Sequence, residues 1–273
     1  MPELPEVEVT RLGVSPYLVG QRVTGLVLRR AGLRWPFPEN LAKKVVGQTV
    51  QSTSRRGKYL LVNFKKGSVI IHLGMSGHIR VLPDHIPAEL HDHVDIVLGK
   101  QLLRLTDPRR FGAVLWHDLQ DGVIEQHPLL QKLGIEPLTD QFDGTVLYKA
   151  TRHRKITIKQ MLLAGDVVVG VGNIYASESL FLSGISPTTP VHEISLARYK
   201  KLASAIKKIL AEAIIKGGSS LKDFINVNGE SGYFQQNYYV YDRAAQPCRV
   251  CRTEIRQIKQ GQRSTFYCVN CPK

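Results

Sequence analysis

The front of the chain places a proline and a carboxylate where they could act together. Initiator methionine is usually removed when a small residue follows it, so we expect the mature chain to begin with the secondary amine of Pro2. An α-amino group has a pKa of about 8, against about 10.4 for lysine, so a useful fraction is neutral and can attack an electrophilic carbon to form an iminium. Glu3 is the adjacent candidate for a general acid.

The same residues also allow a purely structural interpretation. Pro2 and Pro5 would stiffen the first turn of a helix, and Glu3, Glu6 and Glu8 would favour the positive end of its dipole. Acidic first turns are common, so composition alone favours this second interpretation.

Four cysteines near the end of the chain form two Cys-x2-Cys pairs, Cys248 with Cys251 and Cys268 with Cys271, with 16 residues between the pairs. This spacing is typical of a four-thiolate zinc ribbon, and the segment between the pairs predicts a hairpin. Two disulfides are the alternative, which an intracellular protein disfavours. Because four thiolates complete a tetrahedral shell, we expect one zinc ion with a structural role.

The charge balance indicates a polyanionic partner. Lys and Arg number 37 against 23 Asp and Glu, which gives a net charge of +14. Nucleic acid is the simplest such partner, and a basic balance that serves only solubility is the alternative. The sequence has neither a run of 18 apolar residues nor a basic-then-apolar leader, so we expect a cytoplasmic protein with no membrane association.

The order of the patterns predicts two domains and a small appendage. A helix is expected over residues 5–18, and β-type runs follow it at 22–30, 45–54, 58–64, 68–74, 78–82, 94–98, 102–105 and 113–117. Eight short strands in succession favour a sandwich or barrel. Helical spacing dominates later, most clearly over 195–216, with Ser195 as the expected N-cap and Gly217 and Gly218 as the stop.

Several motifs occur in one order, namely Met1–Glu8, Arg56–Leu60, Thr106–Gly112, Gly170–Glu178 and the cysteine pairs. Together they resemble bacterial formamidopyrimidine-DNA glycosylase from end to end. The resemblance reverses the structural interpretation of the N-terminus. It implies a base excision repair enzyme that flips and excises oxidised purines, 8-oxoguanine and formamidopyrimidines, from double-stranded DNA. It also implies a lyase that nicks the strand at abasic sites by β,δ-elimination.

The resemblance implies an α+β fold. We expect an N-terminal catalytic β-sandwich domain with an N-terminal helix over residues 1–130, a linker over 131–150, a DNA-binding domain with a helix-two-turn-helix over 151–237, and a zinc finger over 238–273. It further implies a monomer that associates with the bacterial nucleoid through DNA.

Four residues match the catalytic positions of the family. The resemblance implies that Pro2 forms the Schiff base at the sugar C1′ and that Glu3 serves as acid and base. It implies that Lys58 protonates or positions a phosphate near the scissile bond, and that Arg263 holds phosphates and assists the second elimination. Without the family, Lys58 reads as one more surface lysine in a basic patch.

Six further residues match DNA-binding positions. The resemblance implies that Met75, Arg109 and Phe111 fill the gap left by the extruded nucleotide, with Arg109 facing the orphaned base. Apolar wedges that unstack a base step are a known minor-groove device, although single Met and Phe residues more often lie in a core. His91 and Lys155 match positions that bind the DNA backbone.

Asn173 is the sixth, and it follows a glycine-rich run. Gly170–Asn173 lacks the third glycine and the βαβ unit of a dinucleotide site, so we expect Asn173 to cap a helix whose free N–H groups meet a phosphate. A metal pair of His91 and His93 is disfavoured because no third ligand is evident. Residues 226–236 match the loop that closes over the flipped base.

Two departures from the family stand out, Asp166 where many relatives are basic and Asp242 where glycine is common. They put local phosphate contacts and a turn in doubt. One rival activity is the sister endonuclease VIII type, which Leu4 and the Arg109–Phe111 motif disfavour. The other is a catalytically silent DNA-binding protein, which the intact Pro2, Glu3 and Lys58 disfavour.

Overall fold

The computed structural model describes residues 2–218 and 238–272. These residues fall into two compact units, the first formed by residues 2–131 with 216–218 and the second by residues 132–215 with 238–272. Each unit is described by itself. The domain limits at residues 130, 150 and 237 stay predictions.

The first unit begins with helix α1 (Leu4–Leu18), close to the predicted helix over 5–18. Glu3 is its N-cap, and Pro5 occupies the first turn, where the missing N–H of proline costs nothing. Val7, Val14 and Leu18 recur at helical spacing and are fully buried in the core. The helix contacts strands from two different sheets and thereby closes one side of this unit.

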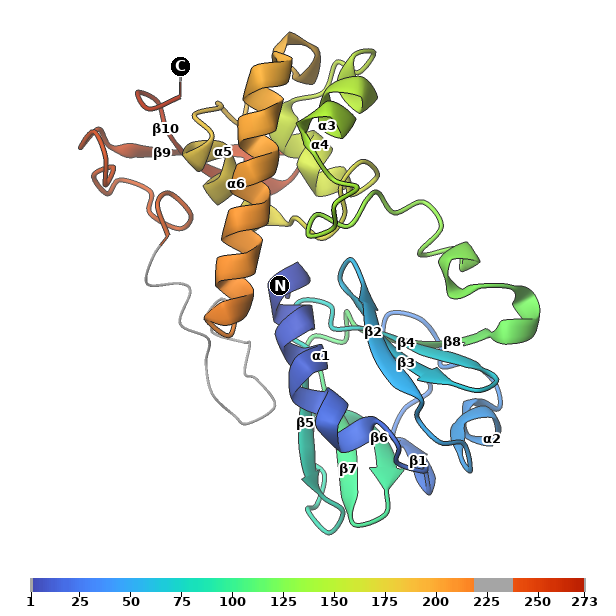
Figure 1. Cartoon of the computed structure of the whole chain (residues 1–273). Coiled ribbons are helices and arrows are strands. Elements are labelled where there is room, and N and C mark those ends of the chain that lie inside the picture. Colours follow the sequence, from blue (N-terminus) through green and yellow to red (C-terminus); the bar gives the residue numbers. More distant parts are fainter. Residues whose placement is uncertain (1, 219–237, 273) are drawn as a thin grey trace. The chain divides into compact units, whose positions relative to one another are not determined.

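Two four-stranded antiparallel sheets form the body of the first unit (Figure 1). One has the order β1 (Gly25–Leu28), β6 (Asp92–Leu98), β7 (Gln101–Thr106) and β5 (His78–Pro83). The other has the order β2 (Ser52–Arg56), β3 (Tyr59–Phe64), β4 (Gly67–His72) and β8 (Ala113–Asp118). Alternate side chains from both sheets enter one apolar core, as on Leu60, Val62 and Phe64. The predicted β-sandwich domain is confirmed.

One predicted strand is partly wrong. Residues 45–54 were expected to be extended, but α2 (Leu41–Val45) occupies their start and β2 begins only at Ser52. The β-branched pair Val45 and Val46 suggested a strand. In the structure Val45 instead buries its side chain from the last turn of a helix, and the chain then turns at Gly47, whose φ is +87°.

The second unit is helical and carries a hairpin. It contains α3 (Gly144–Thr151), α4 (Ile158–Ala164), α5 (Asn173–Leu182), α6 (Leu196–Ile215), β9 (Ile255–Gln260) and β10 (Arg263–Cys268). Short 3-10 turns lie at Leu119–Asp121 and Ile124–Gln126 in the first unit and at Val191–Glu193 in the second. α3 begins inside the segment expected to be linker.

The predicted helix over 195–216 is confirmed as α6. The Ser195 hydroxyl accepts a hydrogen bond from the Arg198 N–H at 3.4 Å, and Gly217 and Gly218 follow the helix with φ of +76° and +86°. None of the helices in residues 2–218 and 238–272 is long and apolar enough to cross a membrane.

Candidate functional site

Pro2 and Glu3 lie at the buried start of α1. Pro2 is buried, and Glu3 and Glu6 are 1% and 0% exposed. The Glu6 carboxylate accepts a hydrogen bond from the Glu3 N–H at 2.8 Å, which holds the backbone at the helix entrance. A carboxyl group held next to the candidate amine has the placement that proton transfer requires.

The turn that carries Lys58 is fixed to the first half of α1. Glu8 of α1 bonds Arg11 at 2.6 Å and Arg55 of β2 at 3.0 Å. Arg55 then donates to the carbonyl of Gly57 at 2.8 Å, in the residue just before Lys58. Burial opposes ionisation of Glu8, but hydrogen bonds and the charges of Arg11 and Arg55 prevail and lower its pKa. The charged form of Glu8 therefore anchors this turn.

The loops of Met75 and Phe111 lie against each other. Gly74 adopts a φ of +64°, and a Cβ on it would meet the backbone of Phe111 and Gly112 at 2.5 Å, so only glycine permits this approach. The Ser76 hydroxyl donates to Asp107 at 2.9 Å and accepts from the Arg109 N–H at 3.2 Å. The structure thus brings these two predicted wedge loops together.

The tip of the second loop is open to solvent. Phe111 is 46% exposed, and the Arg109 guanidinium lies over its ring at 4.9 Å. Arg110 between them adopts a φ of +57°, which residues other than glycine rarely adopt. Nearly half of this aromatic residue is exposed on a turn with a positive φ, so that part of it can contact a ligand.

His91 and His93 take different places. His93 is 1% exposed and its Nε2 lies 3.0 Å from the carbonyl of Asp107, whereas His91 is exposed. The carbonyl of His91 accepts the Asp107 N–H at 3.0 Å, which ties His91 to the base of the Phe111 loop. The disfavoured metal pair finds no support among the described residues, whose one cluster of possible metal ligands is the four cysteines.

His72 is a site residue that the sequence did not reveal. It ends β4 just before the Met75 loop, and its Nδ1 accepts the Gly74 N–H at 3.0 Å. Burial, followed by the charges of Lys58 and Arg34, lowers the pKa of His72 to about 4. His72 is therefore neutral at physiological pH and supports the loop as a hydrogen-bond acceptor.

His72→Gln should remove part of the acid sensitivity of folding. The unfolded pKa of histidine is about 6.5. Between that value and the folded pKa of about 4, the unfolded chain binds a proton that the folded chain does not bind. Stability is complete above this window and is lost as the pH falls through it, by at most about 3 kcal/mol. Urea unfolding of both proteins across the window measures the difference.

His85, whose side chain is 76% exposed, supplies the matched control. His85→Gln makes the same substitution at an exposed position and measures what loss of an exposed histidine does to unfolding. Equal slopes for wild type and His72→Gln would show that His72 is protonated equally in both states.

In the second unit the tip of the zinc hairpin rests on two helices. Asn173 donates from Nδ2 to the carbonyl of Ser264 at 2.9 Å, next to Arg263. Lys159 of α4 is fully buried and donates to the Ser264 carbonyl at 3.0 Å and to the Thr265 hydroxyl at 2.8 Å. Arg263 is exposed and begins β10, where its backbone pairs with Gln260 of β9. Lys155 is exposed in the loop before α4.

The predicted cap at Asn173 is wrong. Gly172 is the N-cap of α5, and Asn173 is the first helical residue. Its side chain bonds the hairpin instead of its own helix, because Ser264 lies within reach. Lys159 was also missed, since a lysine in a basic sequence gives no sign of burial.

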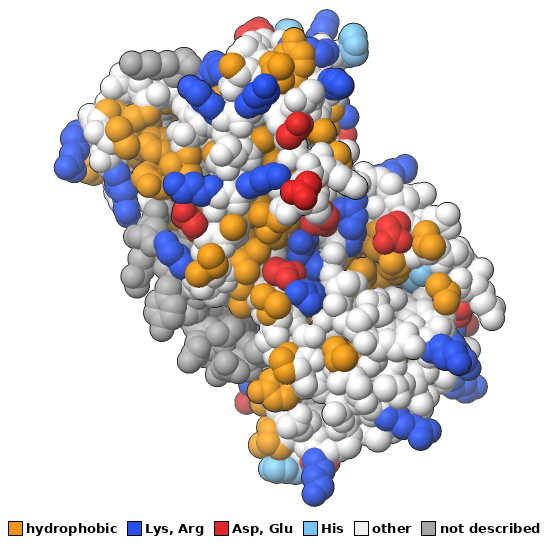
Figure 2. Space-filling view, in the orientation of Figure 1, with side chains coloured by type: hydrophobic (Ala, Val, Ile, Leu, Met, Phe, Trp, Pro, Cys, Tyr) orange, Lys and Arg blue, Asp and Glu red, His pale blue; other side chains and the backbone are white. Residues whose placement is uncertain are grey.

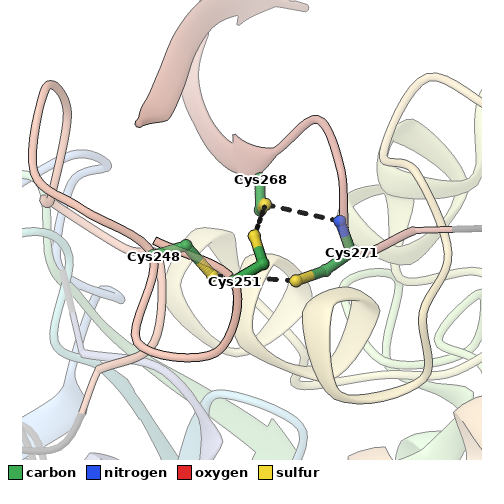
Figure 3. Close-up of side chains that lie close together, drawn as sticks. All are labelled: Cys248, Cys251, Cys268 and Cys271. Carbon is green, nitrogen blue, oxygen red and sulfur yellow. Dashed lines mark hydrogen bonds between the residues drawn. The ribbon is translucent and has the colours of Figure 1, made fainter. Parts of the chain in front are cut away.

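The four cysteines converge (Figure 3). Their sulfur atoms all lie within 4.8 Å of one another, with 3.7 Å between Cys248 and Cys271 and 3.4 Å between Cys251 and Cys268. Bonds of 2.3 Å to a tetrahedral zinc place sulfur atoms about 3.8 Å apart, so the cluster fits this ion. The Val250 N–H donates to the sulfur of Cys248, and the N–H groups of Asn270 and Cys271 donate to the sulfur of Cys268. These hydrogen bonds stabilise thiolate charge.

The departures at Asp166 and Asp242 have simple structural outcomes. Asp166 pairs with Arg154 at 2.7 Å on the surface. Asp242 adopts a φ of +58°, so the turn forms without glycine. The predicted loop over 226–236 lies outside the described residues.

Three family models match the chain in order. The formamidopyrimidine-DNA glycosylase N-terminal domain matches residues 1–114, the H2TH domain of the same enzyme matches residues 133–225, and a zinc finger found in FPG and IleRS matches residues 245–272. The third match and the sulfur geometry identify the cysteine cluster as a structural zinc site.

Curated relatives are similar over their whole length. Formamidopyrimidine-DNA glycosylases of Janthinobacterium sp. (strain Marseille) and Herminiimonas arsenicoxydans are 66% and 64% identical, with complete coverage of both chains. A Lactococcus lactis FPG mutant in complex with DNA containing Fapy-dG has a TM-score of 0.92 at 32% identity, with complete coverage of both chains. Thermus thermophilus MutM (FPG) has a TM-score of 0.89 at 32% identity, covering 99% of this chain and 98% of its own.

Proposed function

Because the chain belongs to the formamidopyrimidine-DNA glycosylase family, a family of base excision repair glycosylases, we propose that it excises 8-oxoguanine and formamidopyrimidines from duplex DNA and then nicks the strand. The observation that carries this proposal is the buried pair of Pro2 and Glu3 at the start of α1. Solved Lactococcus lactis relatives hold DNA with Fapy-dG or an abasic site, which supports the same substrates here. We propose that the enzyme acts as a monomer on nucleoid DNA in the cytoplasm.

Excision begins with the nitrogen of Pro2. It forms a bond to the sugar C1′ while the bond from C1′ to the base breaks and the base leaves with a proton. Glu3 then gives a proton to the ring oxygen, the sugar opens, and the nitrogen lone pair completes an iminium at C1′. Four cysteines that complete a tetrahedral shell leave a zinc ion no open position for substrate, so we assign these steps to Pro2 and Glu3.

Strand cleavage follows from the iminium. Its positive charge acidifies the C2′ protons, so a base removes one of them and the bond from C3′ to its phosphate oxygen breaks. A second elimination removes the C4′ proton and breaks the bond from C5′ to its phosphate oxygen. Lys58 and Arg263 position these phosphates as leaving groups, and water then hydrolyses the iminium and releases Pro2.

The remaining residues hold the DNA open. Met75, Arg109 and Phe111 fill the space of the extruded nucleotide, which the contact between their loops supports. His91, Lys155 and Asn173 contact the backbone, where positive or donor groups near phosphate supply sequence-independent affinity.

A lesion panel tests the proposed activity. Purified protein should cleave duplexes that carry 8-oxoguanine or a formamidopyrimidine faster than duplexes that carry an oxidised pyrimidine. A preference for the oxidised pyrimidine would assign the endonuclease VIII type of activity, and binding without cleavage would assign a silent DNA-binding protein.

Phe111→Ala should slow excision of 8-oxoguanine paired with cytosine by about tenfold to a hundredfold, because flipping costs a few kcal/mol that the ring helps to offset. The same lesion in an unpaired bulge and a preformed abasic site need less extrusion, so their cleavage should be nearly normal. Single-turnover rates on the three substrates measure this pattern. Equal losses on all three would mean that Phe111 supports the fold.

A further inference from the structure

A second concave site lies at the other end of α1 from Pro2. Its cavity of about 990 Å³ is lined by the end of α1 at Val19, by α2, by residues 46–51, by the β3–β4 turn and by Trp116 and Asp118 of β8. Pro2 precedes the first turn of α1, and a 15-residue helix is about 22 Å long. The cavity is therefore separate from the proposed catalytic site, and all of its lining belongs to the first unit.

The lining carries a strong positive charge. Four lysines border the cavity, as two neighbouring pairs, Lys43 with Lys44 on α2 and Lys65 with Lys66 in the β3–β4 turn. Asp118 is the one acidic residue of the lining, so four positive charges and one negative leave three positive charges. Figure 2 shows Lys and Arg side chains over the part of the first unit that carries α2. Such a concave, cationic site raises the local concentration of anionic ligands.

The cavity also has an apolar side. Val19 and Val46 are 41% and 38% exposed, and Trp116 packs on Phe64 with 6.1 Å between ring centres. Exposed apolar side chains next to lysines suit an occupant that has carboxylates and apolar side chains together. A volume near 1,000 Å³ is at the upper end for a compact ligand, and it accommodates several residues of an extended chain.

The same details disfavour nucleic acid as the occupant. The Lys44 ammonium lies over the Trp116 ring at 5.9 Å and pairs with Asp118 at 3.8 Å. A base would have to displace Lys44 to stack on that ring, and a single strand that leaves Lys44 in place would lose the stacking contribution of about 1–3 kcal/mol per base. The cations of the lining are all lysines, without the guanidinium forks that bind phosphate in a bidentate manner.

We propose that this cavity binds an acidic peptide segment of a partner protein that carries both carboxylates and apolar side chains. The peptide carboxylates pair with the two lysine pairs, and an apolar side chain packs between Val19, Val46 and Trp116. Because the site is separate from Pro2, the partner can bind while the catalytic site holds DNA.

Tryptophan fluorescence reports on this site directly. The chain has only two tryptophans, so Trp35→Phe in the full-length protein leaves Trp116 as the single emitter. The probe is a short peptide of alternating Asp and Leu, compared with the same peptide with Asn in place of Asp and with an oligothymidylate of equal charge. We expect a saturable change in Trp116 emission with the Asp peptide and little or none with the other two.

Charge-reversal variants decide whether the lysine pairs cause the binding. The double variant Lys43→Glu with Lys65→Glu should bind the Asp peptide with an affinity at least about tenfold lower. Lys100→Glu with Lys149→Glu makes the same change of net charge at exposed positions outside the cavity and should change affinity by less than about twofold. Thermal unfolding of both variants checks that the fold is retained, and glycosylase activity should be unchanged in both.

Three results would overturn the proposal. One is the absence of a saturable signal with the Asp peptide. Another is an equal loss of affinity for the Asp peptide in the two double variants, which would show a general charge effect. The last is tighter binding of the oligothymidylate with sensitivity to Lys43 and Lys65, which would make the cavity a nucleic-acid contact.

Discussion

Replacing Pro2 with Thr, or retaining Met1, should abolish the covalent adduct that borohydride traps between this protein and DNA carrying 8-oxoguanine. Borohydride reduces an iminium to a stable amine, so the adduct reports the proposed bond between the Pro2 nitrogen and C1′. In protein that retains Met1 the loss should be at least about a thousandfold, because the amide nitrogen of an internal proline has no lone pair free for attack. Denaturing electrophoresis of the trapped complex measures it.

Pro5→Ala is the matched control, since Pro5 lies in the same buried first turn of α1. It should keep the adduct, which separates the amine chemistry of Pro2 from the stiffness of the turn. An undiminished adduct in protein that retains Met1 would rule out Pro2 and point to a lysine side chain. Mass spectrometry of the reduced peptide would identify that lysine.

Local patterns in the sequence predicted most elements of the fold. Helical spacing predicted α6, and β-type runs separated by turn residues predicted the eight strands of the first unit. The cysteine spacing predicted the metal site, because ligand spacing within a chain limits the geometry that the ligands can reach. The strand predicted over 45–54 was partly wrong because β-branched residues also occur in a short, buried helix such as α2.

Contacts between distant residues could not be predicted in the same way. Gly74 against Phe111, Glu8 with Arg55 and Lys159 with Ser264 each join separate segments, and no local pattern marks the partner. His72 shows the same limit, because its lowered pKa depends on burial and on nearby charges from other strands and loops. The roles of Pro2 and Glu3 came from motifs in order along the chain, since composition alone favoured a structural interpretation.

Cys251→Ser should release the zinc and disorder the finger. The apolar cluster that supports the hairpin is small, and two of its six buried residues are cysteines. The six are Phe181, Val240, Cys248, Ile255, Phe266 and Cys268. Metal binding contributes about 10–16 kcal/mol to folding of zinc-finger peptides at neutral pH, far more than such a cluster supplies. Elemental analysis should show about one zinc per wild-type chain and almost none in the variant.

Loss of the zinc should also reduce DNA binding and the stability of the helical unit. A disordered hairpin no longer positions Arg263, and Lys159 of α4 loses its bonds to Ser264 and Thr265. A buried ammonium that loses partners is costly, so the thermal unfolding temperature of the variant should also fall. We expect DNA affinity to drop by at least about tenfold, as filter binding or anisotropy would show.

Arg263→Ala separates the phosphate contact of Arg263 from the folding of the zinc finger that carries it. This variant should keep its zinc and its unfolding temperature, and it should lose one phosphate contact, seen as a salt dependence of binding lower by about one ion. Cys251→Ser should instead lose zinc, stability and affinity together. Full DNA affinity in zinc-free Cys251→Ser protein would mean that the finger contributes nothing to binding, and an unchanged unfolding temperature would mean that α4 and the hairpin fold independently.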